Sequence, residues 1–166
     1  HRKYAESRDF ADSNVRYRLL SPGLFWLQNV LCVSTFWYST PVLLSFHHSS
    51  GLRILGFLML YLAMWLYFLS LGKLGQNYSP CYEAYMPISL VTSGPYRLIR
   101  HPMYLAKILT GIGMLFVSGS IWLAVSLLYL VVETIRSVIR EESYLAAVSG
   151  FKAYKARSKM IIPFVF

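Results

Sequence analysis

Residues 94 to 102, with the sequence GPYRLIRHP, combine charged and aromatic side chains with two prolines. Proline is favoured at the first position of a helix, and it disfavours a helical backbone in the residue before it. The stretch therefore predicts a turn at Gly94-Pro95, followed by a helix that begins at Pro102 and has His101 as its N-cap.

The start of this predicted helix can bind an anionic group. We expect free amides at Met103 and Tyr104, where the helix dipole adds partial positive charge. Arg100 contributes a full positive charge, and Tyr96 contributes a flat ring with a polar end. These features suit a ligand with a negative group and a ring. The alternative is an anchor at the membrane interface, in which Arg reaches the head groups and Tyr belongs to an aromatic belt.

A second group of charges follows the last long apolar run. Glu141 and Glu142 are adjacent, and Glu133 lies deeper in the run, where a carboxylate is costly and usually has a partner. Arg136 and Arg140 follow Glu133 at helical spacing, so these three residues are expected to form a charged ladder on one helix face. The acidic pair is suited to a cationic ligand. Salt bridges at a solvated helix end are the other interpretation.

The elements that carry these residues are predicted to be membrane helices. Of the 166 residues, 56% are hydrophobic and 14% are charged, which is typical of a membrane protein. We expect one domain, residues 1–166, with an all-α integral membrane fold that crosses the bilayer about four times. The predicted spans are residues 23–46, 52–71, 103–117 and 121–139.

The basic residues are sorted along the chain. Five of the sixteen Lys and Arg precede the first predicted span, four lie in 73–107, and six lie in 136–159. Only Arg53 lies at an outer hairpin tip. By the positive-inside rule, both termini and both groups of site residues face the cytoplasm. We therefore attribute the net charge of +9 to topology and anionic lipid, and expect no nucleic-acid partner. The two cysteines, Cys32 and Cys81, have no metal-binding spacing, so no metal is expected.

Three segments resemble the isoprenylcysteine carboxyl methyltransferase and phospholipid methyltransferase superfamily. They are SLVTSGPYRLIRHPMYLAKIL (89–109), the E-E-x-x-L of 141–145, and GFKAYKARSKMIIPF (150–164). The resemblance implies a small multi-span methyltransferase that uses S-adenosylmethionine at the cytoplasmic face and admits a lipophilic acceptor from the bilayer. It also implies that residues 72–166 form the cofactor-binding half, with a cytoplasmic C-terminal helical segment completing the pocket.

The site residues follow from the resemblance together with the chemistry above. The expected cofactor-binding residues are Leu90, Val91, Tyr96, Arg100, His101, Pro102, Met103, Tyr104, Glu141 and Glu142. The charged ladder of Glu133, Arg136 and Arg140 is expected to act on the acceptor, an isoprenylcysteine carboxylate or a phospholipid amine. Gly111 and Gly113 resemble a G-x-G cofactor element of phospholipid methyltransferases, or they allow close helix contacts.

Two other functions remain open. Membrane sterol reductases share a related C-terminal architecture and use NADPH, although adjacent carboxylates repel its phosphates. A non-catalytic membrane subunit is the second alternative. The expected location is a bacterial inner membrane or the endoplasmic reticulum, with the chain crossing it several times.

Overall fold

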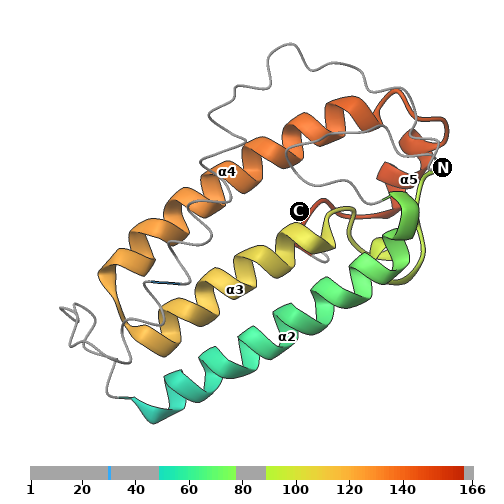
Figure 1. Cartoon of the computed structure of the whole chain (residues 1–166). Helices are drawn as coiled ribbons and strands as arrows, with labels where there is room; N and C mark the ends of the chain where they lie inside the picture. The colour runs from blue at the N-terminus through green and yellow to red at the C-terminus, as the bar shows by residue number, and fades with distance from the viewer. Residues whose placement is uncertain (1–29, 31–48, 78–88, 163–166) are drawn as a thin grey trace.

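The computed structural model describes residue 30, residues 49–77 and residues 89–162. Three long helices dominate this part of the chain: α2 (Ser50–Leu74), α3 (Pro102–Ser118) and α4 (Ile121–Leu145). A short helix, α5 (Phe151–Arg157), follows α4, and the 3-10 turns η2 (Gly75–Asn77) and η3 (Gly94–Arg97) lie between α2 and α3. The described residues include no named strand. The expectation of an all-α fold is confirmed for them (Figure 1).

In the described part of the chain, two helices are long and apolar enough to cross a membrane. Each of α2 and α4 has 25 residues, which corresponds to about 37 Å of helix. They contain the predicted spans 52–71 and 121–139. The predicted span 103–117 is helical as α3, which has 17 residues and is about 26 Å long. The predicted span 23–46 lies outside the described residues, so the number of four spans remains a prediction.

Large apolar side chains cover the outer surfaces of α2 and α4. Such a surface would be costly in water, whereas hydrocarbon solvates it. The exposed residues include Phe57, Leu58, Tyr61, Trp65 and Phe68 on α2 and Trp122, Val125, Leu128, Val132 and Ile135 on α4. Their exposure supports the placement of these helices in a bilayer.

Glycine allows α2 and α3 to approach each other closely. A Cβ atom on Gly56 would lie 2.9 Å from the carbonyl oxygen of Gly113, and a Cβ on Gly113 would lie 2.9 Å from that of Gly56. Both glycines are therefore required at this helix contact. The structure gives Gly113 a packing role, which was the second of the two interpretations of the G-x-G element.

A tight hairpin connects α3 to α4. Gly119 adopts a left-handed conformation (φ 63°), and its amide donates a hydrogen bond to the carbonyl of Leu115 at 2.8 Å. Just beyond this turn, Met114 of α3 and Leu123 of α4 form a buried apolar core. Figure 1 shows the two helices close together at the hairpin and farther apart toward the opposite end.

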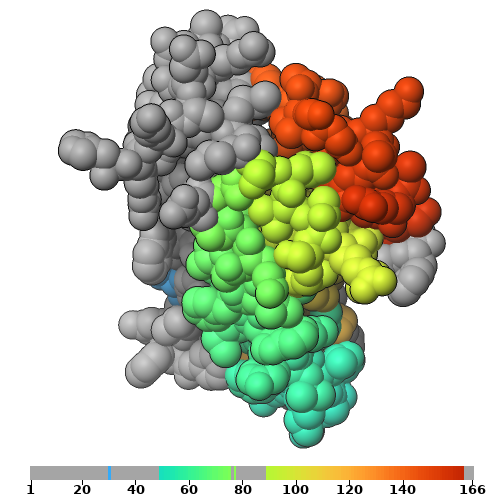
Figure 2. Space-filling model, turned by 90° about the vertical axis from the view of Figure 1, so that its right-hand side faces the viewer, coloured from blue at the N-terminus to red at the C-terminus, as the bar shows by residue number. Residues whose placement is uncertain are grey.

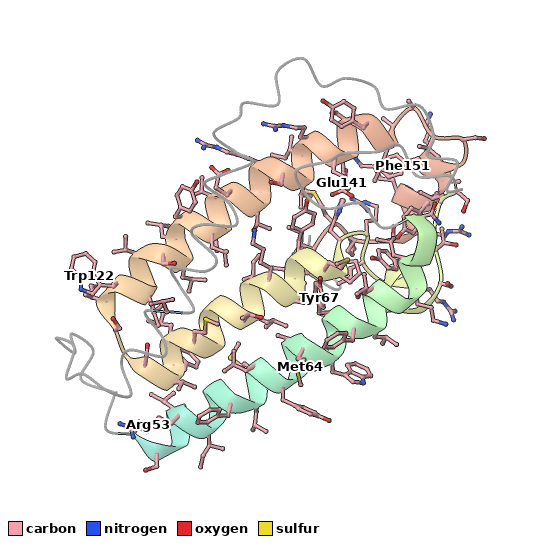
Figure 3. The ribbon with its side chains drawn as sticks, in the orientation of Figure 1. Arg53, Met64, Tyr67, Trp122, Glu141 and Phe151 are labelled. Carbon is pink, nitrogen blue, oxygen red and sulfur yellow. The ribbon has the colours of Figure 1, made fainter. Side chains whose placement is uncertain are left out.

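The two ends of the bundle differ in composition. Figure 3 shows Arg53 and Trp122 at the hairpin end, and Glu141 and Phe151 at the other end. The second end also contains the start of α3, the short helix α5 and the turn η3 (Figure 1). The residues that could bind a ligand or take part in catalysis therefore gather at one end of the bundle.

Candidate functional site

Helix α3 begins where the sequence predicts. Pro102 is its first residue, and His101 is the N-cap with φ −125° and ψ 59°. The expectation of a free amide at Tyr104 is wrong, because this amide donates to the His101 carbonyl at 3.2 Å, as does the amide of Leu105. The His101 carbonyl thus serves two donors and tightens the first turn, which leaves less of the helix start for an anion.

The C-terminal segment holds the chain just before α3. Ile99 and Lys159 form an isolated parallel bridge. The amide of Arg100 donates to the Lys159 carbonyl at 2.8 Å, the amide of Lys159 donates to the Leu98 carbonyl at 2.9 Å, and the amide of His101 donates to the Met160 carbonyl at 3.1 Å. In Figure 2 the yellow-green segment before α3 lies between the end of α2 and the red C-terminal region. The backbone that presents Arg100 and His101 is therefore fixed on both sides.

Arg100 and Glu142 form a mostly buried ion pair. The Arg100 Nε donates to Glu142 Oε1 at 2.6 Å, and the two side chains are 6% and 10% exposed. A guanidinium nitrogen of Arg100 also donates to the carbonyls of Ser158 and Lys155. Lys155 Nζ lies 2.9 Å from Glu142 Oε2. Arg100 thus connects the start of α3, the end of α4 and the segment after α5.

The charge of Glu142 is strongly stabilised. This residue lies beyond the predicted membrane span 121–139, at the end of α4. His101, Lys155 and Arg100 hold the pKa of its carboxyl well below the usual range, against the opposing effect of burial. Glu142 therefore remains ionised at any physiological pH.

His101 lies between both glutamates. Its Nδ1 is 3.7 Å from Glu141 Oε2, and its Nε2 is 3.6 Å from Glu142 Oε1. The His101 side chain is 2% exposed, whereas that of Glu141 is 46% exposed. The His101 Nε2 is buried and has no hydrogen-bond partner in the described structure. A buried ring nitrogen without a hydrogen bond is costly, and this one faces the Glu142 carboxylate at 3.6 Å.

Two buried tyrosines support the same end of the bundle. The hydroxyl of Tyr154 donates to the carbonyl of Tyr96 at 2.6 Å, and the Ser158 hydroxyl donates to the Tyr154 carbonyl at 2.7 Å. Burial raises the pKa of Tyr154 to about 12. The pKa of Tyr96 is raised further, by burial and by the charge of Glu141. Both hydroxyls therefore stay protonated, and that of Tyr154 acts as a hydrogen-bond donor.

The other expected cofactor-binding residues surround this cluster. Pro102 is buried, whereas Leu90, Val91, Met103 and Tyr104 are half-buried. The rings of Tyr104 and His101 lie 5.8 Å apart. These side chains provide apolar and aromatic surface next to the charged groups.

The charged ladder on α4 lies apart from this cluster. Arg136 pairs with Glu133 at 2.9 Å, as the spacing predicts, but the Arg136 side chain is 62% exposed and that of Glu133 is 15% exposed. Arg140 is also exposed. Nine residues, or two and a half helical turns, separate Glu133 from Glu142, so they lie on opposite sides of α4. The structure therefore brings Arg100, His101, Glu141 and Glu142 together but leaves the ladder on another face.

Sequence reasoning missed two contributors to the site, Lys155 and Ser158. The sequence left Tyr154 open between lining the pocket and facing the head groups. Only the fold shows that these three residues contact Tyr96, Glu142 and Arg100. Among the described residues, no group of three or more His, Cys, Asp or Glu is arranged to hold a metal ion.

The family model for phospholipid methyltransferases matches residues 52–151. This range is 100 of the 166 residues and contains both the motif before α3 and the acidic pair. The chain therefore belongs to the phospholipid methyltransferase family, within the isoprenylcysteine and phospholipid methyltransferase superfamily. The family implies methyltransferase activity on a lipid at a membrane. No curated protein and no solved structure matches the chain.

Proposed function

We propose that this family member transfers a methyl group from S-adenosylmethionine to a lipid-like acceptor, such as an isoprenylcysteine carboxylate or a phospholipid amine. One observation carries the proposal. Arg100 and Glu142, which are 42 positions apart in the chain, meet at 2.6 Å and place His101 between two carboxylates. Both halves of the family motif thus contribute to one cluster.

The residues of the cluster fit the proposed cofactor. Glu141 is half-exposed, so its carboxylate can accept hydrogen bonds from an ammonium group. The unpartnered Nε2 of His101 can serve as donor to a carboxylate. The half-buried side chains of Leu90, Val91 and Met103 provide apolar surface for an adenine ring, and Tyr104 and the backbone around Tyr96 complete this surface. When bound, S-adenosylmethionine supplies a methyl group activated on a positively charged sulfur.

The two adjacent glutamates have different roles in this proposal. Glu142 is already compensated by Arg100 and Lys155, so it holds the start of α3 and the tail against α4. The Glu141 side chain lies 3.7 Å from the His101 ring and is 46% exposed, so its carboxylate can be reached by a ligand. We therefore assign cofactor binding to Glu141 and His101, and the positioning of both to Arg100 and Glu142.

Orientation and exclusion of water are the main tasks of the protein in this reaction. A carboxylate acceptor arrives ionised and needs no general base. An ammonium acceptor must lose a proton first, and we propose that the acidic pair beside His101 receives it, because Glu133 lies on the opposite side of α4. Arg136 and Arg140 face outward and are suited to the capture of anionic head groups at the bilayer surface.

The site is proposed to face the cytoplasm. Basic residues gather at this end of the bundle, in the segment before α3 and in the segment that contains α5. The hairpin end contributes Arg53. This asymmetry supports an orientation with the cluster on the cytoplasmic side.

Thermal unfolding of the purified protein tests the function. A ligand that binds only the native state raises the melting temperature, so S-adenosylmethionine and S-adenosylhomocysteine should raise it, while NADPH should not. Substitution His101→Ala should reduce the shift. A shift with NADPH alone would favour a reductase, and no shift with any of the three ligands would favour a non-catalytic subunit.

A further inference from the structure

Lys107 is a charged residue on an apolar helix. It lies five positions after the start of α3 and is half-buried. Met114, which packs against Leu123 of α4, is seven residues later, or almost two full turns. Lys107 therefore lies on the same stripe of α3, which faces α4. An ionisable residue inside an apolar helix is costly and is usually functional.

The two ends of the α3–α4 pair locate the level of Lys107. His101 meets Glu142 at 3.6 Å at one end, and Met114 meets Leu123 near the hairpin. Because the helices are antiparallel and each rises about 1.5 Å per residue, Lys107 lies at the level of Glu133 and Thr134. This level is about 9 Å deeper than His101, at six residues along α3.

Thr134 is a second unusual residue at this level. It is 0% exposed, and its hydroxyl oxygen has no hydrogen-bond partner in the described part of the chain. Two other hydroxyls on the long helices donate to the carbonyl four residues earlier: Thr110 to Ala106 at 3.0 Å and Ser70 to Leu66 at 2.6 Å. Leaving a buried hydroxyl unpaired is costly, so the Thr134 hydroxyl requires a partner from outside this set of residues.

The acidic residue of α4 at the same level is already paired. Glu133 forms its ion pair with Arg136 at 2.9 Å. Among the residues that the structure describes, no hydrogen bond or ion pair involves the Lys107 ammonium. One ammonium and one hydroxyl therefore lie at the same depth between α3 and α4, and both are hydrogen-bond donors.

We propose that Lys107 and Thr134 bind the acidic head group of the methyl acceptor. This inference rests on the proposed function and deepens it, because it assigns the acceptor an anionic group. Two sources share that chemistry: the phosphate of a phospholipid and the carboxylate of a prenylated cysteine. The head group enters between α3 and α4 from the bilayer. In a phospholipid the reacting amine then lies beyond the bound phosphate, toward His101 and Glu141, whereas in a prenylated cysteine the bound carboxylate is itself the group that is methylated.

The direct test measures lipid binding without turnover. The melting temperature of the detergent-purified protein is recorded with short-chain phosphatidic acid, with N-acetyl-S-farnesylcysteine, and with their neutral counterparts, diacylglycerol and the farnesylcysteine methyl ester. At least one anionic lipid should raise the melting temperature more than its neutral counterpart. A response to phosphatidic acid alone identifies a phosphate site, and a response to the free carboxylate alone identifies a prenylcysteine site. Equal responses to all four lipids would overturn the proposal.

Two variants connect that response to the residues. Lys107→Met should raise the melting temperature of the ligand-free protein, because it removes an unpaired ammonium from an apolar helix. The same variant should lower the affinity for the anionic lipid by about tenfold or more, since a hydrogen bond to a charged group is lost. Thr134→Val should lower this affinity less. Lys152→Met removes the same charge from the exposed face of α5 and should change neither quantity.

The outcomes separate this inference from the proposed function. If the protein binds S-adenosylhomocysteine and methylates a lipid, but Lys107→Met leaves the acceptor KM and the ligand-free stability unchanged, the head-group site is wrong and the function stands. If no S-adenosylhomocysteine binds but anionic lipid binding depends on Lys107, the head-group site stands and the function is wrong.

Discussion

Two groups of charges lie on the same helix and differ in what holds them. Glu142, at the end of α4, is in contact with Arg100 from the segment before α3 and with Lys155 from α5. Glu133, two and a half turns earlier, is paired with Arg136 from its own helix. The Glu142 cluster thus depends on the tertiary fold, whereas the Glu133–Arg136 pair needs only the helix.

Because the two groups differ in burial, they contribute differently to the stability of the protein. A buried charge that loses its partner is strongly destabilising, whereas an exposed pair contributes little because water and salt screen it. The arrangement around Glu142 therefore fixes the geometry of the site. The Glu133–Arg136 pair leaves its arginine free to exchange its partner for a ligand at the bilayer surface.

The largest expected effect is a loss of stability when the ion pair between Arg100 and Glu142 is removed. Arg100→Gln leaves the Glu142 carboxylate in a mostly buried position and should cost about 3 kcal/mol or more of the free energy of unfolding. Unfolding in detergent micelles by increasing denaturant measures this loss. Arg97→Gln is the matched control, because it removes the same charge from an exposed position three residues away.

A double variant sharpens this prediction. In Arg100→Gln/Glu142→Gln neither partner is charged, so the double variant should be more stable than Arg100→Gln alone. If the two losses simply add, the side chains do not interact and the central ion pair of the site is disproved.

The second prediction distinguishes the roles of the two adjacent glutamates in ligand binding and in stability. Glu141→Gln should lower the affinity for S-adenosylhomocysteine by about tenfold, because one hydrogen bond to a charged group is lost. The stability of the ligand-free protein should stay unchanged. Glu142→Gln should lower both the affinity and the stability, because Arg100 and Lys155 then lose their common partner. Isothermal titration calorimetry and thermal unfolding measure the two quantities. Equal behaviour of both variants would contradict the division of roles.

The sequence alone predicts much of this arrangement, and the residues explain where it stops. The N-cap at His101, the helix start at Pro102 and the pairing of Glu133 with Arg136 depend on neighbours within four positions. Such local rules can be recognised in a sequence. The resemblance also connected the motif around His101 with the acidic pair, which meet in the structure.

The contacts that were not predicted join distant segments. The bridge between Ile99 and Lys159 and the salt bridge from Lys155 to Glu142 depend on where the C-terminal segment lies. No helical or strand period encodes that position. The amide of Tyr104 was expected to be free, but the His101 carbonyl accepts hydrogen bonds from the amides of both Tyr104 and Leu105, as often happens at a helix terminus. Tertiary packing and cap geometry therefore account for what the sequence left open.

A smaller effect is expected from pH and from Tyr154. Burial raises the pKa of Tyr154 from its ordinary value of 10.0 to about 12, so its contribution to stability is complete below pH 10 and is lost as pH rises toward 12. Tyr154→Phe removes the hydrogen bond to the Tyr96 carbonyl and should cost about 1 kcal/mol at pH 8. It should also reduce the loss of melting temperature between pH 10 and 12. Tyr61→Phe, at an exposed position of α2, should leave this pH dependence unchanged, and identical curves for both variants would disprove the role of Tyr154.

The smallest effect is expected at Arg136, which belongs to the exposed pair with Glu133. Its side chain is 62% exposed, so Arg136→Gln should change the free energy of unfolding by about 1 kcal/mol or less and should not alter the affinity for S-adenosylhomocysteine. If the arginine captures head groups, the KM for an anionic acceptor should rise by about fivefold or less, and the rise should shrink as salt is added because the charge is screened. Methyl transfer in vesicles of anionic lipid, measured at low and high salt, tests both points. A loss of stability as large as that of Arg100→Gln would show that the two groups of charges do not differ as their burial predicts.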